Sequence, residues 1–249
     1  MKRRPEKLNR FYGDDIPDSE ENKQHQLVTL IGMLKHVPVC QIYVPDCEGD
    51  DVIAYLCRGP MRSLRKVIVS ADKDMYQLLD DDTSIYSLHR KTFVTSTDVL
   101  SEFGIRTHNF ALAKCVAGDP GDNVPGVDGI GFKTVAKKFP LLASDEVVLL
   151  SDFVAYAAAR REEGAVYRKV FEAKTDLERN WQLVHLDGSV LSADQSRRVD
   201  YVVDTFKPSV DRMGLVKALM KEGVVDFDAE GFYYDISCVQ VNRDAPEKR

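Results

Sequence analysis

Hydrophobic residues in the first hundred positions alternate between helical and strand-like spacing. Leucine and isoleucine recur at helical spacing between residues 17 and 34, whereas the runs 37–44 and 66–70 are apolar and rich in β-branched residues. The expected elements are a helix over 17–34, a strand over 37–44, a helix over 50–58, a strand over 66–70, a short helix over 74–79, strands over 84–88 and 92–95, and a helix over 97–103. This alternation predicts an α/β fold whose sheet is at least partly parallel.

The pattern becomes helical after about residue 107. Residues 111–117 predict a helix, and the segment Gly118–Gly131 then holds five glycines and two prolines. Helical spacing resumes at Lys133 and continues to about Leu186, and the tail from Asp235 is mixed. We therefore predict two regions, an α/β region over 1–106 and a helical region over 107–249.

Composition narrows the class of protein. The 249 residues are 44% hydrophobic and 30% charged, as in ordinary globular proteins. No apolar run approaches the roughly 20 residues that a membrane span needs, and the basic N-terminus has no apolar segment behind it that would make a signal peptide. The five cysteines, at 40, 47, 57, 115 and 238, are never spaced as Cys-x-x-Cys. This indicates reduced thiols in a cytoplasmic location and argues against a structural zinc site.

The distribution of charge is more informative than the net charge of −6, which does not suit a simple basic DNA-coating protein. Acidic residues gather at 46–51, 72–74, 80–82 and 119–122, and basic residues gather at 2–10, 62–66, 133–138 and 160–161. Such segregation is compatible with an acidic metal pocket beside a basic track for a nucleic-acid backbone. It is equally compatible with ordinary solvated faces.

Three acidic motifs follow predicted elements. Glu48-Gly49-Asp50-Asp51 comes after strand 37–44, Asp72-Lys73-Asp74 comes after strand 66–70, and Asp119 and Asp122 open the glycine-rich segment. Ligands of open α/β sheets bind beyond the carboxyl ends of the strands, where the first two motifs lie. Each motif alone also fits a helix cap or a turn. Together they predict a metal site.

The kind of ligand indicates the metal. Carboxylates gathered at neutral pH repel one another unless a cation neutralises them. Oxygen ligands without histidine or cysteine favour Mg²⁺ or Mn²⁺, and two such ions can act on a phosphodiester. An aspartyl-nucleophile phosphatase is an alternative for Asp72-Lys73-Asp74, but that class usually follows its second aspartate with Gly and then Thr or Val, and here Met75-Tyr76 follow.

The segment from Val124 to Thr134 is rich in glycine but does not have phosphate-loop spacing, because Phe132 separates Gly131 from Lys133. It predicts a hairpin between two helices. Gly129 and Gly131 would let the backbone approach a phosphate, and Lys133 would add positive charge. A purely structural helix turn is the alternative.

These motifs, in this order, resemble the 5′-nuclease domain of bacterial DNA polymerase I and the phage 5′→3′ exonucleases. The family pattern is Glu-Ala-Asp-Asp, Asp-x-Asp, Gly-Asp-x-x-Asp-Asn and Val-Pro-Gly-Val-x-Gly-Ile-Gly-x-Lys-Thr, and only Gly49 replaces a motif residue. The resemblance implies a PIN-like, mostly parallel sheet flanked by helices, followed by a helix-two-turn-helix (helix-hairpin-helix-like) region. It implies a flap endonuclease or 5′→3′ exonuclease that uses two Mg²⁺ or Mn²⁺ ions.

The resemblance also implies site residues. The first metal site would use Glu48, Asp50 and Asp51, and the second would use Asp72, Asp74, Asp119 and Asp122. DNA would contact Gly129, Ile130, Gly131, Phe132, Lys133 and Thr134 in the hairpin and Arg3, Arg4 and Arg10 in a basic arch segment. Relatives can bind K⁺ through main-chain carbonyls, and the matching positions are Val116, Ala117, Pro125, Val127 and Ile130.

The N-terminus departs from the family pattern. Family members open with two strands that each carry a metal-binding aspartate, and roughly 60 residues would be needed for these strands and their crossover. We expect that the start lies upstream, that another chain supplies the missing part, or that catalysis has been lost. The functional alternatives are an active monomeric nuclease on flapped, nicked or branched DNA, with replication proteins as partners, and a DNA-junction-binding module or half of a split nuclease.

Overall fold

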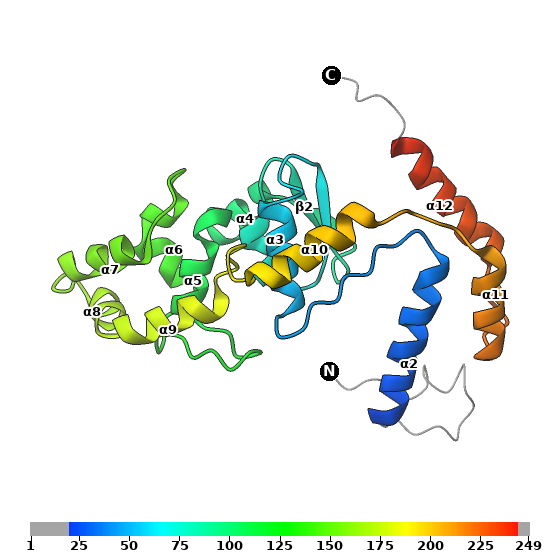
Figure 1. Cartoon of the computed structure of the whole chain (residues 1–249). Helices are drawn as coiled ribbons and strands as arrows, with labels where there is room; N and C mark the ends of the chain where they lie inside the picture. The colour runs from blue at the N-terminus through cyan, green and yellow to red at the C-terminus, as the bar shows by residue number, and fades with distance from the viewer. Residues whose placement is uncertain (1–19, 244–249) are drawn as a thin grey trace. The chain divides into compact units, whose positions relative to one another are not determined.

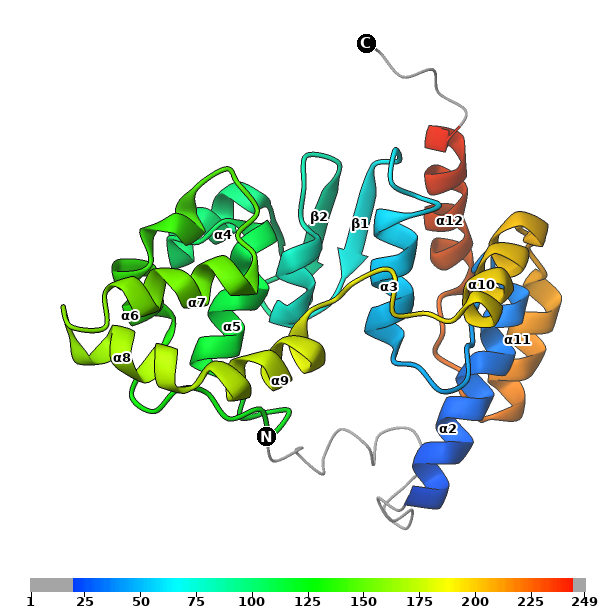
Figure 2. The same cartoon turned by 60° about the vertical axis from the view of Figure 1, so that its left-hand side comes forward.

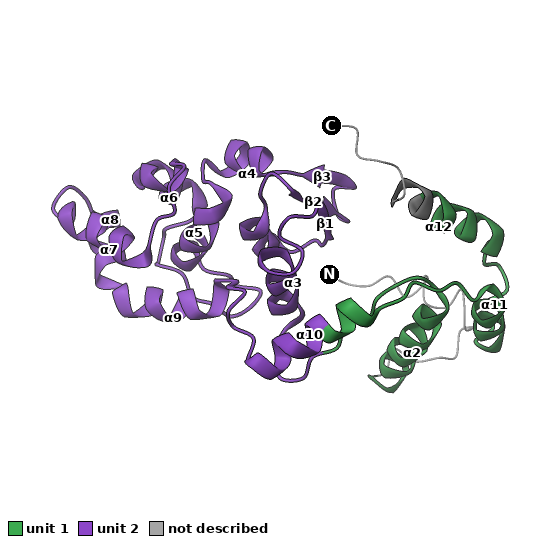
Figure 3. Ribbon diagram, turned by 45° about the horizontal axis from the view of Figure 1, so that its top comes forward, with its two compact units in different colours: residues 1–43, 201–249 green, residues 44–200 purple. Residues whose placement is uncertain are grey.

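The computed structural model describes residues 20–243. The chain forms two compact units (Figure 3): residues 44–200 form one, and the described parts of 1–43 and 201–249 form the other. The boundary between units therefore falls at different positions from the predicted division at residues 106 and 107, which lies inside unit 2.

Unit 2 contains a three-stranded sheet in the order β1-β2-β3. The strands are β1 Lys66–Val69, β2 Thr83–Ser87 and β3 Thr92–Val94. The β1–β2 pair is parallel and the β2–β3 pair is antiparallel, so the expectation of a partly parallel sheet is confirmed. One face is buried through the aligned side chains of Ile68, Ile85 and Val94.

The predicted strand over 37–44 is not formed. Val37 and Val44 are buried, but within residues 20–243 the segment pairs with no strand. Its polar groups use local partners instead: the Val39 amide donates to the Val37 carbonyl at 2.7 Å, and the Gln41 side chain donates to the Ile31 carbonyl at 3.1 Å. The prediction failed because apolar, β-branched composition does not supply the neighbouring strand that a ladder requires.

Helices make up most of unit 2 (Figure 1). They are α3 Gly49–Arg58, η3 Lys73–Leu78, α4 Ser96–Phe103, η4 Thr107–Asn109, α5 Phe110–Ala117, α6 Phe132–Lys138, η5 Pro140–Ala143, α7 Leu150–Ala159, α8 Ala165–Glu172, α9 Lys174–Val184 and α10 Ala193–Thr205, the last of which contains the boundary between units. Figure 2 shows α3 beside β1 and the α5–α9 helices on the other side of the sheet. The helical prediction for 133–186 is confirmed for most of its length, with non-helical segments at 144–149 and 160–164.

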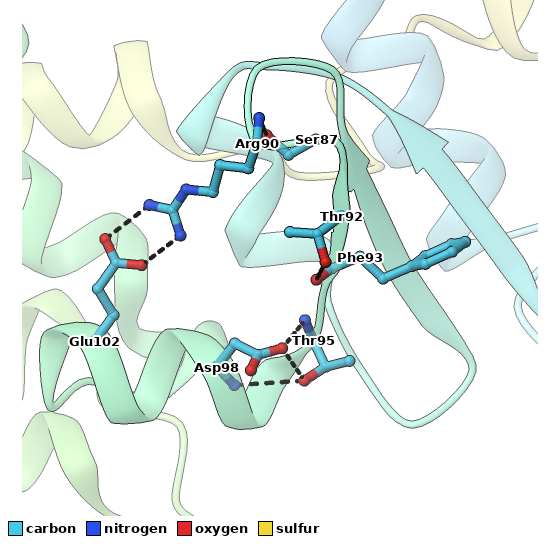
Figure 4. A network of polar contacts seen from close by, with 7 residues as sticks. All are labelled: Ser87, Arg90, Thr92, Phe93, Thr95, Asp98 and Glu102. Carbon is cyan, nitrogen blue, oxygen red and sulfur yellow. Dashed lines mark hydrogen bonds and ion pairs between the residues drawn. The ribbon is translucent and has the colours of Figure 1, made fainter.

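A polar network joins the β2–β3 hairpin to α4 (Figure 4). The Arg90 guanidinium donates two hydrogen bonds to Glu102, at 2.8 and 2.9 Å. Thr95 caps α4, because its hydroxyl accepts from the Asp98 amide while Asp98 accepts from the Thr95 amide at 2.8 Å. Such a cap stabilises a helix by about 1 kcal/mol. The network fixes the edge of the sheet to the helical part of the unit.

Helix α5 lies at the centre of the unit 2 core. Its residues from Phe110 to Val116 are all buried, and it packs against α6 and α9. The Phe110 ring lies 5.3 Å from the rings of both Phe103 and Phe132 and 5.5 Å from that of Tyr76. The aromatic packing fixes the N-terminal end of α5, and the glycine-rich segment begins after its C-terminal end.

Unit 1 contains α2 Glu20–Met33, η2 Leu34–His36, α11 Arg212–Lys221 and α12 Ala229–Arg243. Val37, Leu215 and Tyr233 form its small core. The tail expected to be mixed from Asp235 is helical as far as Arg243, the last described residue, and Tyr233 and Ile236 of α12 pack in or against this core. Among residues 20–243, no helix combines enough length with enough apolar character to cross a bilayer.

Candidate metal centre

Acidic side chains from three separate segments line one pocket of about 300 Å³ in unit 2. They come from the start of α3, from the turn after β1 and from the loop after α5, and they are Glu48, Asp50, Asp72, Asp74 and Asp122. Val124, Leu183, Val184 and Leu186 complete the wall. The structure therefore brings all three acidic motifs together. It does so without the expected strand 37–44, since the first motif is positioned by the N-terminus of α3.

Local hydrogen bonds fix these motifs. The Glu48 amide donates to Asp51 Oδ2 at 3.2 Å, which holds Asp51 at the start of α3, where negative charge also suits the helix dipole. Asp72 caps η3, because its Oδ1 accepts from the Asp74 amide at 2.9 Å. The capping interpretation is confirmed for these residues, and it is compatible with a metal site because a carboxylate has two oxygens.

Electrostatic repulsion concentrates on Asp50. Burial raises the pKa of its carboxyl group, and the neighbouring charges of Asp72, Glu48, Asp51 and Asp122 raise it further. A carboxyl group in this position gains from any cation that enters the pocket. The shift thus identifies Asp50 as the place where the negative potential of the three motifs overlaps.

A second group lies beside the first. Asp74, Asp119 and Asp122 each place a carboxylate oxygen within 4.8 Å of the others, a spacing that could hold a metal ion. Asp119 is fixed by two backbone hydrogen bonds with Val124, at 2.8 and 2.9 Å, and its Oδ1 accepts from the Gly121 amide at 2.8 Å. An all-oxygen group of this kind fits a hard cation such as Mg²⁺ or Mn²⁺.

Lys114 is a member of the site that the sequence interpretation missed. Its residue is 4% exposed, and its ammonium pairs with Asp74 Oδ1 and, at 2.7 Å, with Asp119 Oδ2. The lysine hydrogen bond is the main cause that lowers the pKa of Asp119. The available signal was a single lysine within an otherwise apolar helical run, Phe110–Ala117, five residues before the Asp119 motif.

The glycine-rich segment folds as a tight hairpin against α5 and α9. The Val127 amide donates to the Val116 carbonyl at 2.7 Å. The buried Asn180 amide of α9, also missed from sequence, donates to the Cys115 carbonyl at 2.9 Å and the Pro125 carbonyl at 2.8 Å. A Cβ added to Gly126 would lie 2.4 Å from the carbonyl of residue 117, so only glycine fits there.

The predicted K⁺ ligands belong to this hairpin. The carbonyls of Val116, Pro125 and Val127 already accept hydrogen bonds, the last from the Ile130 amide at 3.0 Å. A carbonyl oxygen has a second lone pair, so these bonds leave coordination open. The K⁺ assignment to these three residues, Ala117 and Ile130 stays a prediction.

The hairpin residues predicted to contact DNA differ in how far they are exposed to solvent. The side chain of Ile130 is buried, so DNA could reach only its backbone, whereas Phe132 is half-buried and packs against the core. Gly129, Gly131 and Lys133 are exposed, and Thr134 is half-buried at the start of α6. Arg3, Arg4 and Arg10 lie outside the described residues.

Comparison with known sequences finds relatives of one family. Residues 6–104 match the family described as 5′-3′ exonuclease, N-terminal resolvase-like domain. The thermostable DNA polymerase I of Thermus aquaticus is 29% identical over 204 residues, which are 81% of this chain and 23% of that protein. The 5′-3′ exonuclease of Aquifex aeolicus is 27% identical over 181 residues, 71% of this chain and 63% of that protein. These matches show that the chain is similar to members of the 5′-nuclease family.

Solved structures agree with this 5′-nuclease assignment at the level of the fold. A T5 5′-exonuclease with bound zinc ions superposes with a TM-score of 0.60 at 18% identity, over 82% of this chain and 77% of that one. A bacteriophage T5 flap endonuclease in a complex with DNA and metal ions gives a TM-score of 0.55 at 18% identity, over 93% and 75% of the two chains. The α/β, PIN-like fold class expected from the sequence is confirmed. The chain spans less than two thirds of the length of the polymerase and exonuclease relatives named above.

Proposed function

We propose that this chain is a structure-specific 5′-nuclease that hydrolyses DNA phosphodiesters at 5′ flaps or 5′ ends with two Mg²⁺ or Mn²⁺ ions. The observation that carries the proposal is the convergence of acidic side chains from three segments on one pocket, where burial and then their charges raise the pKa of Asp50. The described residues that line the pocket include no histidine or cysteine, which favours a hard cation.

Each of the two metal ions would have its own set of carboxylate ligands. Glu48, Asp50 and Asp51 would hold one ion, and Asp72, Asp74, Asp119 and Asp122 would hold the other. Bound divalent ions would supply a lowered pKa for the attacking water and charge stabilisation for the phosphodiester. The helix start at Glu48 and the Asp119–Val124 turn keep these carboxylates in place before the ions arrive.

The hairpin would hold the duplex beside the pocket. Its backbone is fixed by Asn180, and Gly129, Gly131 and Lys133 are exposed to a phosphate backbone. Contacts of this kind grip DNA without reading its sequence. Arg3, Arg4 and Arg10 would add to the grip, and K⁺ bound by hairpin carbonyls would add positive charge there.

We infer a monomeric cytoplasmic protein acting on flapped, nicked or branched duplexes beside replication proteins. The polymerase I relatives and the five cysteines, which are all free thiols, support this inference.

The test is cleavage of a labelled 5′-flap duplex in Mg²⁺ or Mn²⁺ by the parent chain and its Asp122→Asn variant. We expect cleavage by the parent and none by the variant, because Asp122 belongs to both acidic groups. Asp152→Asn, which removes an exposed carboxylate of α7, is the matched control and should cleave like the parent.

Other outcomes separate the alternatives. Flap binding without cleavage in any divalent metal would refute the enzyme and leave a DNA-junction-binding module or half of a split nuclease. Turnover of a small phosphate ester that Asp72→Asn alone abolishes would point to the aspartyl-nucleophile phosphatase instead. Full activity of Asp122→Asn would refute the role of the second group of carboxylates.

A further inference from the structure

Lys114 is a charged side chain in a position where a charge is costly. It lies in the middle of α5, between the buried residues Ala113 and Cys115, and is itself 4% exposed. Removing an ammonium from water costs several kcal/mol in effective terms unless ion pairs and hydrogen bonds compensate. Its ammonium therefore depends on Asp74 and Asp119, its two carboxylate partners.

These two partners are also candidate metal ligands. Asp74 and Asp119, together with Asp122, make up the group whose oxygens lie within 4.8 Å of one another. Two of the three carboxylates are thus held by a cation that belongs to the protein. A divalent ion entering the group must bind beside this ammonium or displace it.

We propose that Lys114 is the resident counter-cation of this metal group, which holds Asp74 and Asp119 together before the metal binds and weakens their affinity for a divalent ion. The inference rests on the proposed function for the identity of the metal, but it concerns binding and not cleavage. Lys114 is a positioning residue here, since it acts through the two carboxylates.

The charge balance gives the direction of the effect. With Lys114 present, the three carboxylates and the ammonium sum to −2, and without it the group sums to −3. Two cations about 4 Å apart repel strongly even at an effective dielectric constant near 20, so removal of the ammonium should tighten divalent binding roughly tenfold or more. A purely structural ion pair predicts the opposite, because Asp74 and Asp119 would then lose their geometry.

The experiment measures Mn²⁺ binding to the full chain by the loss of the free-ion electron paramagnetic resonance signal. Lys114→Met keeps the length of the apolar stem and removes the charge, so it should bind Mn²⁺ at least about tenfold more tightly than the parent. Lys114→Arg retains the charge and should stay near the parent. Asp122→Asn should weaken Mn²⁺ binding, because its carboxylate belongs to this group.

Thermal unfolding with and without Mn²⁺ covers the case in which Lys114→Met is unstable alone. The rise in Tm caused by Mn²⁺ should be larger for Lys114→Met than for the parent, and Lys114→Gln, a neutral hydrogen-bond donor, should show the same trend. Unchanged or weaker Mn²⁺ binding by folded Lys114→Met and Lys114→Gln would overturn the inference. Tighter Mn²⁺ binding by Lys114→Met, with no flap cleavage by the parent or any variant, would support the role of Lys114 and refute the nuclease function. Cleavage lost only in Asp122→Asn, with unchanged Mn²⁺ affinity in Lys114→Met, would support the nuclease function and refute the role of Lys114.

Discussion

Asn180 gives the sharpest test of how the hairpin is held. Its side chain is 1% exposed and donates from one amide nitrogen to the carbonyls of Cys115 and Pro125, which are 65 and 55 residues away in the sequence. Asn180→Ala removes both hydrogen bonds. Because these two hydrogen bonds tie the end of α5 and the hairpin to α9, we expect the variant to loosen the hairpin and to lower the free energy of unfolding.

The magnitude follows from the burial of the two carbonyls. Cys115 is fully buried, so its unpaired carbonyl costs about 1–3 kcal/mol. Pro125 is exposed and its carbonyl can be rehydrated, so the loss there is about 0.5–1.5 kcal/mol. We expect a total decrease of about 2–4 kcal/mol in the free energy of unfolding.

Urea denaturation followed by circular dichroism measures this change, and fluorescence anisotropy with a labelled flap duplex measures the effect on DNA binding. Gln182→Ala, an exposed amide on the same helix, is the matched control and should leave both quantities unchanged. A urea midpoint for Asn180→Ala equal to that of Gln182→Ala would refute the reasoning. Lower stability with unchanged DNA affinity would refute the link between the hairpin and DNA.

Two further predictions test the charge of the pocket and of the hairpin. The pKa of the Asp50 carboxyl group is raised, chiefly by burial, so the native state binds this proton more tightly than the unfolded chain does. The contribution of Asp50 to stability therefore falls as the pH rises from the ordinary carboxyl pKa through the raised pKa. Asp50→Asn should therefore raise Tm at about pH 7.5 without divalent metal, with a gain that shrinks towards about pH 4; a gain independent of pH would contradict this cause. Lys133→Ala should weaken binding of flap duplexes of any sequence and reduce the slope of log K against log salt by about 1. Lys221 is an exposed lysine of unit 1, and Lys221→Ala should change neither quantity. An unchanged slope for Lys133→Ala would show that Lys133 does not contact a phosphate.

Local pattern sufficed for most elements. Helical spacing located α2, α3 and α5, and continuous apolar runs located β1, because these signals arise between residues that are neighbours in sequence. The same signal gave a wrong prediction at 37–44, where the composition suits a strand but no neighbouring strand pairs with this segment within residues 20–243. It also missed the helix over Asp235, since packing against Leu215 decides that segment.

The sequence by itself determined the resemblance to the 5′-nuclease family and the choice of candidate acidic residues, because ordered motifs are read without knowing the fold. Only the tertiary structure decided which carboxylates share a pocket and which groups hold them. Lys114 meets Asp74 across 40 residues and Asn180 meets Cys115 across 65, and such pairs depend on how α5 packs against its neighbours. A buried charge or amide must find its partners wherever packing places them, and the spacing of residues along the chain carries no record of that choice.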